Sequence, residues 1–218
     1  MTLPGDEMLM HSKGKVTYAV TIKTEPQNVF PWLKQMGCQR GGWYSYDKLD
    51  NGGVPSAQKI ISRFQNLQIG EYLPGRPKDP PGVGFKVSDL KENQYMVLTT
   101  FSKFPSLKPI KDQEPYKNYW KTTWTFFLRE IALHHSRLIV RSQAEYNTWW
   151  ISIFANLIAR PIHFIMQRKQ LMNIKIRAEK LTAAANQSKE PGKIREVKAN
   201  QIRPGKRVEL WAGKVILF

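Results

Sequence analysis

The sequence predicts an α+β fold in which a curved antiparallel sheet wraps around one long helix near the C-terminus. Residues 148–181 are mostly apolar, contain no glycine and have Pro161 as their only helix breaker. Several segments before this stretch alternate apolar and polar residues, which is typical of half-buried strands. Because the strands come first and the long helix comes last, the pattern favours an α+β arrangement.

The late helix has an apolar first half and an amphipathic second half. Spacings of three, four or seven residues predict one face containing Phe164, Leu171, Ile174, Ala178 and Leu181. The polar residues expected mostly on the other side are Gln167, Lys169, Lys175, Arg177 and Lys180. Residues 149–166 are apolar almost all round, so something must bury them. A bilayer span would place Asn156, Arg160 and His163 in lipid, which favours a buried or interfacial helix instead.

The remaining elements follow from alternation and from turn residues. A strand is expected at 16–23, and Thr24-Glu25-Pro26 begins a helix that Gly37 ends. We expect a second short helix at 56–64 and a short strand at 69–73. Four further strands are predicted at 83–90, 94–101, 119–129 and 136–146. Residues 208–218 form either a strand pair around Gly213 or a segment that docks elsewhere.

The order of these elements predicts that the chain has three parts. Residues 1–14 form an N-terminal arm, residues 15–182 form the ligand-binding domain, and residues 183–218 form a basic tail. The whole chain has 34 Lys and Arg against 17 Asp and Glu, a net charge of +17. The basic residues are scattered, which favours a general surface effect over nucleic acid, and an anionic membrane surface remains an alternative partner.

Composition argues against several kinds of chemistry. Cys38 is the single cysteine, so no internal disulfide can form, and a buried structural role at a helix end is expected. The adjacent pair His134-His135 does not have the spacing of a metal site and is expected in an exposed hairpin. No cofactor motif is present, and the N-terminus does not resemble a secretory signal. We therefore expect a cytoplasmic protein, with peripheral membrane contact as an alternative.

Five segments carry a family resemblance. They read PGDE (4–7), EPQNVFPWLKQMG (25–37), RGGWYSYDKLDN (40–51), FQNLQIGEYLP (64–74) and MQRKQLMNIKIRAEKL (166–181). Over residues 4–182 the chain resembles a bacterial branch of the START-like, polyketide cyclase/dehydrase and lipid-transport superfamily, abbreviated SRPBCC. The resemblance implies the helix-grip fold of Bet v 1 and START proteins. It also implies a cavity between sheet and helix that holds a hydrophobic small molecule or lipid, and it supplies no catalytic residues.

Apolar positions on the predicted strands and helix are candidates to line such a cavity. The candidate ligand-binding residues are Arg40, Trp43, Tyr46, Phe85, Met96, Trp124, Phe126, Trp150, Phe154 and Ile158, with Trp120 and Tyr146 among the same apolar walls. Any one of them would serve equally well in a filled core. The argument for a cavity is collective, because a sheet bent around one helix has difficulty filling its interior.

One cluster of polar residues could take part in a chemical reaction. Tyr44, Tyr46 and Asp47 are the candidate acid or base groups, and Arg40 could orient an anionic or carbonyl ligand. The alternative is that Arg40 and Asp47 pair to fix an irregular loop. The function expected first is binding of a hydrophobic ligand. A cyclase/dehydrase-type enzyme is the second possibility, and a basic protein that binds an anionic surface is the third.

Overall fold

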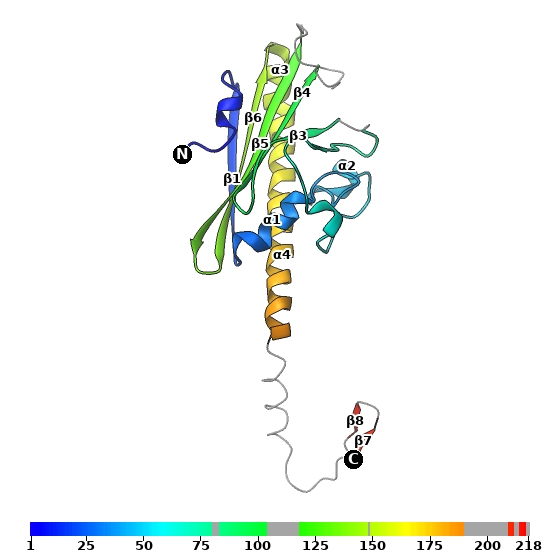
Figure 1. Ribbon diagram of the computed structural model, residues 1–218. Helices are drawn as coiled ribbons and strands as arrows, with labels where there is room; N and C mark the ends of the chain where they lie inside the picture. Colours follow the sequence, from blue (N-terminus) through cyan, green and yellow to red (C-terminus); the bar gives the residue numbers. More distant parts are fainter. Residues whose placement is uncertain (80–82, 104–117, 148, 190–208, 212–213, 217–218) are drawn as a thin grey trace. The chain divides into compact units, whose positions relative to one another are not determined.

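The computed structural model describes residues 1–79, 83–103, 118–147, 149–189, 209–211 and 214–216. The chain divides into two compact units, Met1–Leu181 and Thr182–Phe218. The first unit holds a six-stranded antiparallel sheet in the order β1-β6-β5-β4-β3-β2 (Figure 1). Its strands are β1 (Gly14–Ile22), β2 (Tyr72–Leu73), β3 (Phe85–Lys91), β4 (Tyr95–Lys103), β5 (Tyr119–Ala132) and β6 (His135–Tyr146). The second unit contains the hairpin of β7 (Glu209–Trp211) and β8 (Lys214–Ile216), a strand pair around Gly213.

The helices are short except for the last one. They are η1 (Asp6–Met8), α1 (Pro26–Lys34), α2 (Asp47–Asp50), η2 (Ser62–Phe64), α3 (Trp149–Phe154), the π-helical turn η3 (Ala155–Ala159) and α4 (Arg160–Lys189). Pro161 directly follows the π-helical turn η3, inside a helical run that is continuous from Trp149, so the irregular turn lies where the ring removes a backbone donor. The helix expected at 56–64 is reduced to η2.

The sheet and α4 enclose one hydrophobic core. Leu171, Ile174 and Ala178 of α4 are buried with Phe126 of β5 and Phe30 of α1. In Figure 1, α4 (yellow) runs along the sheet and α1 lies beside it. A curved antiparallel sheet that holds a long C-terminal helix is the helix-grip fold, so the predicted fold class is confirmed.

Two residues of the predicted buried face of α4 lie at its edges, and one polar residue faces inward. Phe164 and Leu181 are largely exposed. Gln167, expected on the polar side, is buried. The prediction was wrong for Gln167 because the sheet offers it a polar partner, the indole N–H of Trp124.

The N-terminal residues pack on the outer face of the sheet. Leu3 and Leu9 are buried, and the Asp6 carboxylate accepts hydrogen bonds from Arg141 (2.5 Å) and Gln143 (2.6 Å) of β6. Both partners project from the face opposite to the helix, because neighbouring residues on a strand alternate between faces. Among the described residues, no helix is both long and apolar enough to cross a membrane.

Candidate functional site

The inner face of the sheet changes character along its length. Residues paired across antiparallel strands project from the same face, so the register sorts them into rows. The rows Met96-Phe126-Val140-Tyr18 and Leu128-Leu138-Val20 are large and apolar. The rows nearer the other end are Leu98-Trp124-Ser142-Val16, Thr100-Thr122-Ala144-Gly14 and Ser102-Trp120-Tyr146. These three rows mix aromatic rings with small side chains, so they leave space between the sheet and α4.

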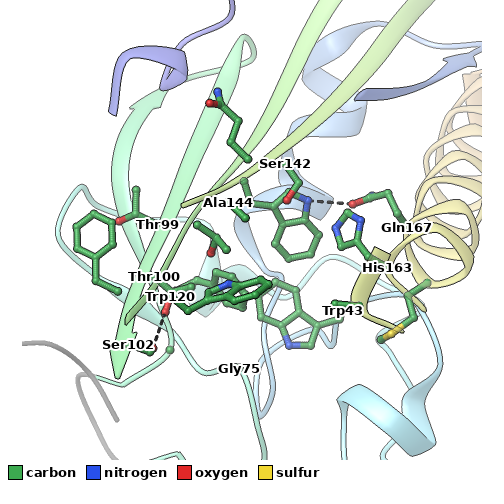
Figure 2. Close-up of a pocket in the computed structure, with 18 of the residues that line it drawn as sticks. Trp43, Gly75, Thr99, Thr100, Ser102, Trp120, Ser142, Ala144, His163 and Gln167 are labelled. Atoms are coloured by element: carbon green, nitrogen blue, oxygen red, sulfur yellow. Dashed lines mark hydrogen bonds between the residues drawn. The ribbon is translucent and has the colours of Figure 1, made fainter. Parts of the chain in front are cut away.

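A cavity of about 880 Å³ occupies this space. Its inner walls include Val16, Tyr18, Trp43, Ser45, Asp50, Phe85, Thr100, Ser102, Trp120, Thr122, Trp124, Ser142, Ala144, Tyr146, Arg160, His163, Met166, Gln167 and Gln170. The lining also reaches outer-face residues, Met8, Lys86, Ser88, Thr99, Phe101 and Gln143. The volume therefore includes a shallower outer part as well as the space between sheet and helix. Figure 2 shows Trp43, Trp120 and His163 around the inner part.

An aromatic cluster forms the inner wall of the cavity. The ring centroids of Trp43 and Trp124 are 5.5 Å apart and nearly stacked. Phe85 lies 5.3 Å from Trp43 and 5.4 Å from Trp124. Aromatic pairs at these separations stabilise each other beyond the area that they bury. The three rings come from a loop and two strands, and together they form a continuous apolar surface.

A chain of hydrogen bonds holds this wall to α4. The Trp124 indole N–H donates to Gln167 Oε1 at 2.9 Å, the dashed line at Gln167 in Figure 2. Gln167 Nε2 donates to Gln170 Oε1 at 2.7 Å, and Gln170 Nε2 donates to the Trp43 carbonyl at 2.9 Å. Buried amides that are bonded in this way cost little and fix their neighbours. Gln167 and Gln170 are thus positioning residues for Trp43 and Trp124.

His163 adds a titratable group on the helix side. Burial lowers the pKa of its imidazole, which favours the neutral ring at neutral pH. The ring lies 6.3 Å from Trp124 and 6.1 Å from Tyr18, measured between centroids. A neutral imidazole offers one donor and one acceptor to a ligand.

Asp50 of α2 adds a second titratable group to the cavity lining. Burial, together with the negative charge of Asp47, raises its pKa to about 6. Neither carboxylate oxygen makes a well-formed hydrogen bond among the described residues, although the Ser45 hydroxyl and the backbone at Tyr46 lie near enough to lower the pKa in part. Ser45 lies close by, but its hydroxyl donates to the Met166 carbonyl at 3.1 Å. Asp50 therefore offers two acceptors to a donor group on a ligand.

Only some of the ligand-binding residues predicted from the sequence line the cavity in the structure. Trp43, Phe85 and Trp124 line the cavity, as do Trp120 and Tyr146. Met96 and Phe126 belong to the filled core, and Ile158 is half-exposed on the helix. Trp150 lies outside the lining, and the side chain of Phe154 lies outside the described residues.

Arg40 and Asp47 fix the loop through separate partners and not by pairing with each other. The Arg40 guanidinium donates to the carbonyls of Lys34 (2.8 Å) and Met36 (3.1 Å) and lies over the Phe64 ring. Burial lowers its pKa. The Ser56 hydroxyl donates to Asp47 Oδ1 at 2.5 Å. Neither side chain lines the cavity.

The two tyrosines predicted as acid or base groups also lie outside the cavity lining. Tyr44 is fully buried, its hydroxyl accepts from Gln35 at 2.7 Å, and burial raises its pKa to about 12. Tyr46 is partly exposed, and the Lys169 ammonium lies 4.2 Å from its ring centroid. The three acid or base candidates therefore do not meet at the cavity.

Sequence reasoning missed the polar residues of the site. Asp50, His163, Gln167 and Gln170 all line the cavity, yet no motif connects them. A polar residue inside an otherwise apolar stretch, such as His163, was the one available signal. Cys38 is buried at the end of the turn after α1, as expected, and burial raises its pKa to about 11. Among the described residues, no group of three metal-ligating side chains occurs.

Comparison with known proteins gives distant structural neighbours only. The Mll3558 protein from Rhizobium loti is 14% identical, with a TM-score of 0.44, over 75% of this chain and 96% of its own. A conserved protein from Geobacillus kaustophilus is 12% identical, with a TM-score of 0.42, over 77% and 96%. An aromatase/cyclase from a Streptomyces species is 10% identical, with a TM-score of 0.37, over 79% and 97%. No family model and no curated protein matches the sequence. The helix-grip assignment therefore rests on the sheet and helix described above.

Proposed function

We propose that the chain binds a hydrophobic small molecule or lipid in the cavity between the sheet and α4. The observation that carries the proposal is the inner face, where small residues such as Thr100, Thr122 and Ala144 leave space beside three aromatic rings, the inner part of a cavity of about 880 Å³. Pockets of this size, with mostly apolar walls and a few polar groups, are typical of small-molecule sites.

The polar groups support a ligand that also carries hydrogen-bonding groups. Both oxygens of the Asp50 carboxylate are buried and make no well-formed hydrogen bond within the described residues, so a ligand hydroxyl or amine would satisfy them. His163 faces the space from α4 and offers a second contact. An apolar body with a hydroxyl or amine group therefore fits this cavity better than a pure hydrocarbon.

Binding is favoured over a cyclase/dehydrase-type reaction. Tyr44, Tyr46 and Asp47, the acid and base candidates, have other partners and lie outside the lining. Catalysis needs such groups within hydrogen-bond reach of the reacting atoms. No observation in the described residues assembles a second set with that geometry.

The test combines ligand recovery with a matched pair of substitutions. Native mass spectrometry of the purified protein should show a bound apolar molecule, which solvent extraction then releases for identification. Ala144→Phe fills the inner row, whereas Ala19→Phe places the same ring on the exposed outer face of β1. We expect Ala144→Phe to weaken the affinity for 1-anilinonaphthalene-8-sulfonate by about tenfold, because overpacking a site costs about 1–3 kcal/mol.

The control should retain the affinity of the unmodified protein. Equal affinity of both variants for the probe, together with no recovered ligand, would contradict a binding cavity at this position. Circular dichroism of both variants confirms that the sheet and helix are intact.

A further inference from the structure

The solvent side of the C-terminal helical segment is apolar. Trp149 is 76% exposed, Leu157 is 72% exposed, and four isoleucines are about half-exposed. We call these residues the outer patch: Trp149, Ile153, Leu157, Ile158, Ile162 and Ile165. The almost uniformly apolar sequence of residues 149–166 predicts burial all round, whereas the folded sheet covers only the other side. A cluster of large apolar side chains on a water-facing helix marks an interaction surface.

The outer patch lies opposite the face that lines the cavity. His163, Gln167 and Gln170 point toward the sheet, whereas Ile158, Ile162 and Ile165 follow one another at spacings of four and three. At 3.6 residues per turn these two sets occupy opposite sides of the helix. A helix that only packs on a sheet would carry polar residues on its outer side. The outer patch therefore has no role in holding the fold of the first unit.

Basic residues surround the outer patch. Between Trp149 and Lys189 the chain has seven Lys and Arg and one acidic residue, Glu179. Arg168 and Lys169 are exposed just beyond the patch, whereas Arg160 lies on the cavity side of the helix, against Gly14. The side chain of Glu179 accepts a hydrogen bond from the Lys23 amide and lies 3.8 Å from Lys175, at the far end. Within residues 149–189, the patch thus combines apolar surface with an excess of positive charge.

A second copy of this chain would fit the spacing but not the charge. Ile158, Ile162, Ile165, Lys169 and Met172 follow the four-three pattern of a coiled-coil seam. Lys169 would then lie in the seam, and Arg168 and Lys175 would flank it. Two such helices would bring like charges together on both sides, which is destabilising.

We propose that the outer patch docks on an anionic membrane surface. Isoleucine and leucine side chains enter the boundary of the acyl chains, tryptophan prefers the headgroup level, and Lys and Arg bind lipid phosphates. The same segment supplies Arg160, His163 and Met166 to the cavity lining. Docking therefore brings the ligand cavity to the bilayer. That last consequence rests on the proposed function, whereas docking itself does not.

Vesicle flotation tests the proposal. The full chain should float with vesicles of phosphatidylcholine and phosphatidylglycerol and should bind vesicles of phosphatidylcholine alone at least tenfold more weakly. Leu157→Gln should reduce binding to the anionic vesicles by about tenfold or more, because a large apolar side chain no longer enters the acyl-chain boundary. Leu133→Gln is the matched control, since Leu133 is 77% exposed in the β5–β6 hairpin, and it should bind as the unmodified chain does.

Charge reversal provides the second arm. Arg168→Glu should weaken binding to anionic vesicles several-fold, whereas Lys48→Glu on α2 should leave it unchanged. No binding to anionic vesicles would overturn the proposal. Binding that depends on Arg168 but not on Leu157 would also overturn it, since it would be adsorption by charge alone. A concentration-dependent dimer that Leu157→Gln abolishes would replace the membrane with a second copy.

The two proposals fail separately. Probe affinity and recovered ligand, measured without vesicles, report on the cavity. Flotation of the Ala144→Phe variant, whose outer patch is unchanged, reports on docking. Loss of docking with an intact cavity overturns only this inference, and loss of ligand with intact docking overturns only the proposed function.

Discussion

The half-buried residue Asp50 gives a prediction with a defined sign and pH window. Its pKa rises from 3.8 to about 6, chiefly because burial disfavours the charged form. A raised pKa means that the folded state binds the proton more tightly than the unfolded state does. The protein therefore loses stability as the pH rises from about 4 to 6 and stays at the lower level above that.

The Asp50→Asn variant should not show this loss. A shift of about two pKa units corresponds to about 3 kcal/mol at about 1.4 kcal/mol per unit. Because Asp50 is only partly shielded from water, we expect a smaller effect of about 1–2 kcal/mol. Relative to the unmodified protein, the variant should thus gain about 1–2 kcal/mol in the free energy of unfolding between about pH 4 and pH 7.

Urea denaturation at the two pH values measures this change. The protein is first stripped of bound lipid, because a ligand that donates to Asp50 would hide the effect. Any cost of placing the Asn amide in the site is the same at both pH values, so it cancels in the comparison. Glu130→Gln, at an exposed position of β5, gives the baseline for replacing a carboxyl group. If the difference in the free energy of unfolding between the variant and the unmodified protein does not change with pH, the inference that Asp50 has a raised pKa is wrong.

Two further predictions concern stability. Gly42→Ala should destabilise the protein by about 3 kcal/mol or more, because its backbone has φ of +80° and a Cβ would lie 2.4 Å from Ser56 Oγ. Gly53→Ala, at φ of +82° but with open space around it, should cost only about 1 kcal/mol, and similar costs at both sites in urea denaturation would contradict the close approach. Arg141→Ala should cost about 2–4 kcal/mol, because it removes the closer and more buried of the two charged partners of Asp6 and leaves only Lys15, 3.4 Å away at the surface. Arg137→Ala, an exposed arginine on the same strand, should cost less than about 0.5 kcal/mol, and an equal loss in both variants would show that Asp6 does not anchor the N-terminal residues.

Local pattern predicts most of the elements because it is set by neighbouring residues. The predicted strands at 83–90, 94–101, 119–129 and 136–146 correspond to β3 to β6 with ends shifted by at most three residues. Alternation alone also places Trp120, Thr122 and Trp124 on one face of β5, as the register shows. Pro26 and Gly37 bracket α1 as expected.

The cavity depends on which rows meet, and pairing decides that. Thr100, Thr122 and Ala144 become neighbours only when β4, β5 and β6 adopt their register. Asp50 and His163 are more than a hundred positions apart in the sequence, yet both line the same space. The tyrosine and aspartate candidates lie close together in the sequence, but the loop turns their side chains toward Gln35, Lys169 and Ser56.

By itself, the sequence determined the strands, the long helix and their order along the chain, which is that of the helix-grip fold. Hydrophobic periodicity and turn residues are local signals that a few neighbouring residues carry. The tertiary structure decided which polar groups share the cavity and that the outer patch faces water. Helical periodicity identifies apolar faces, but it does not say which of two apolar faces the sheet will cover. That choice follows from contacts between distant strands, whose free energy no local window contains.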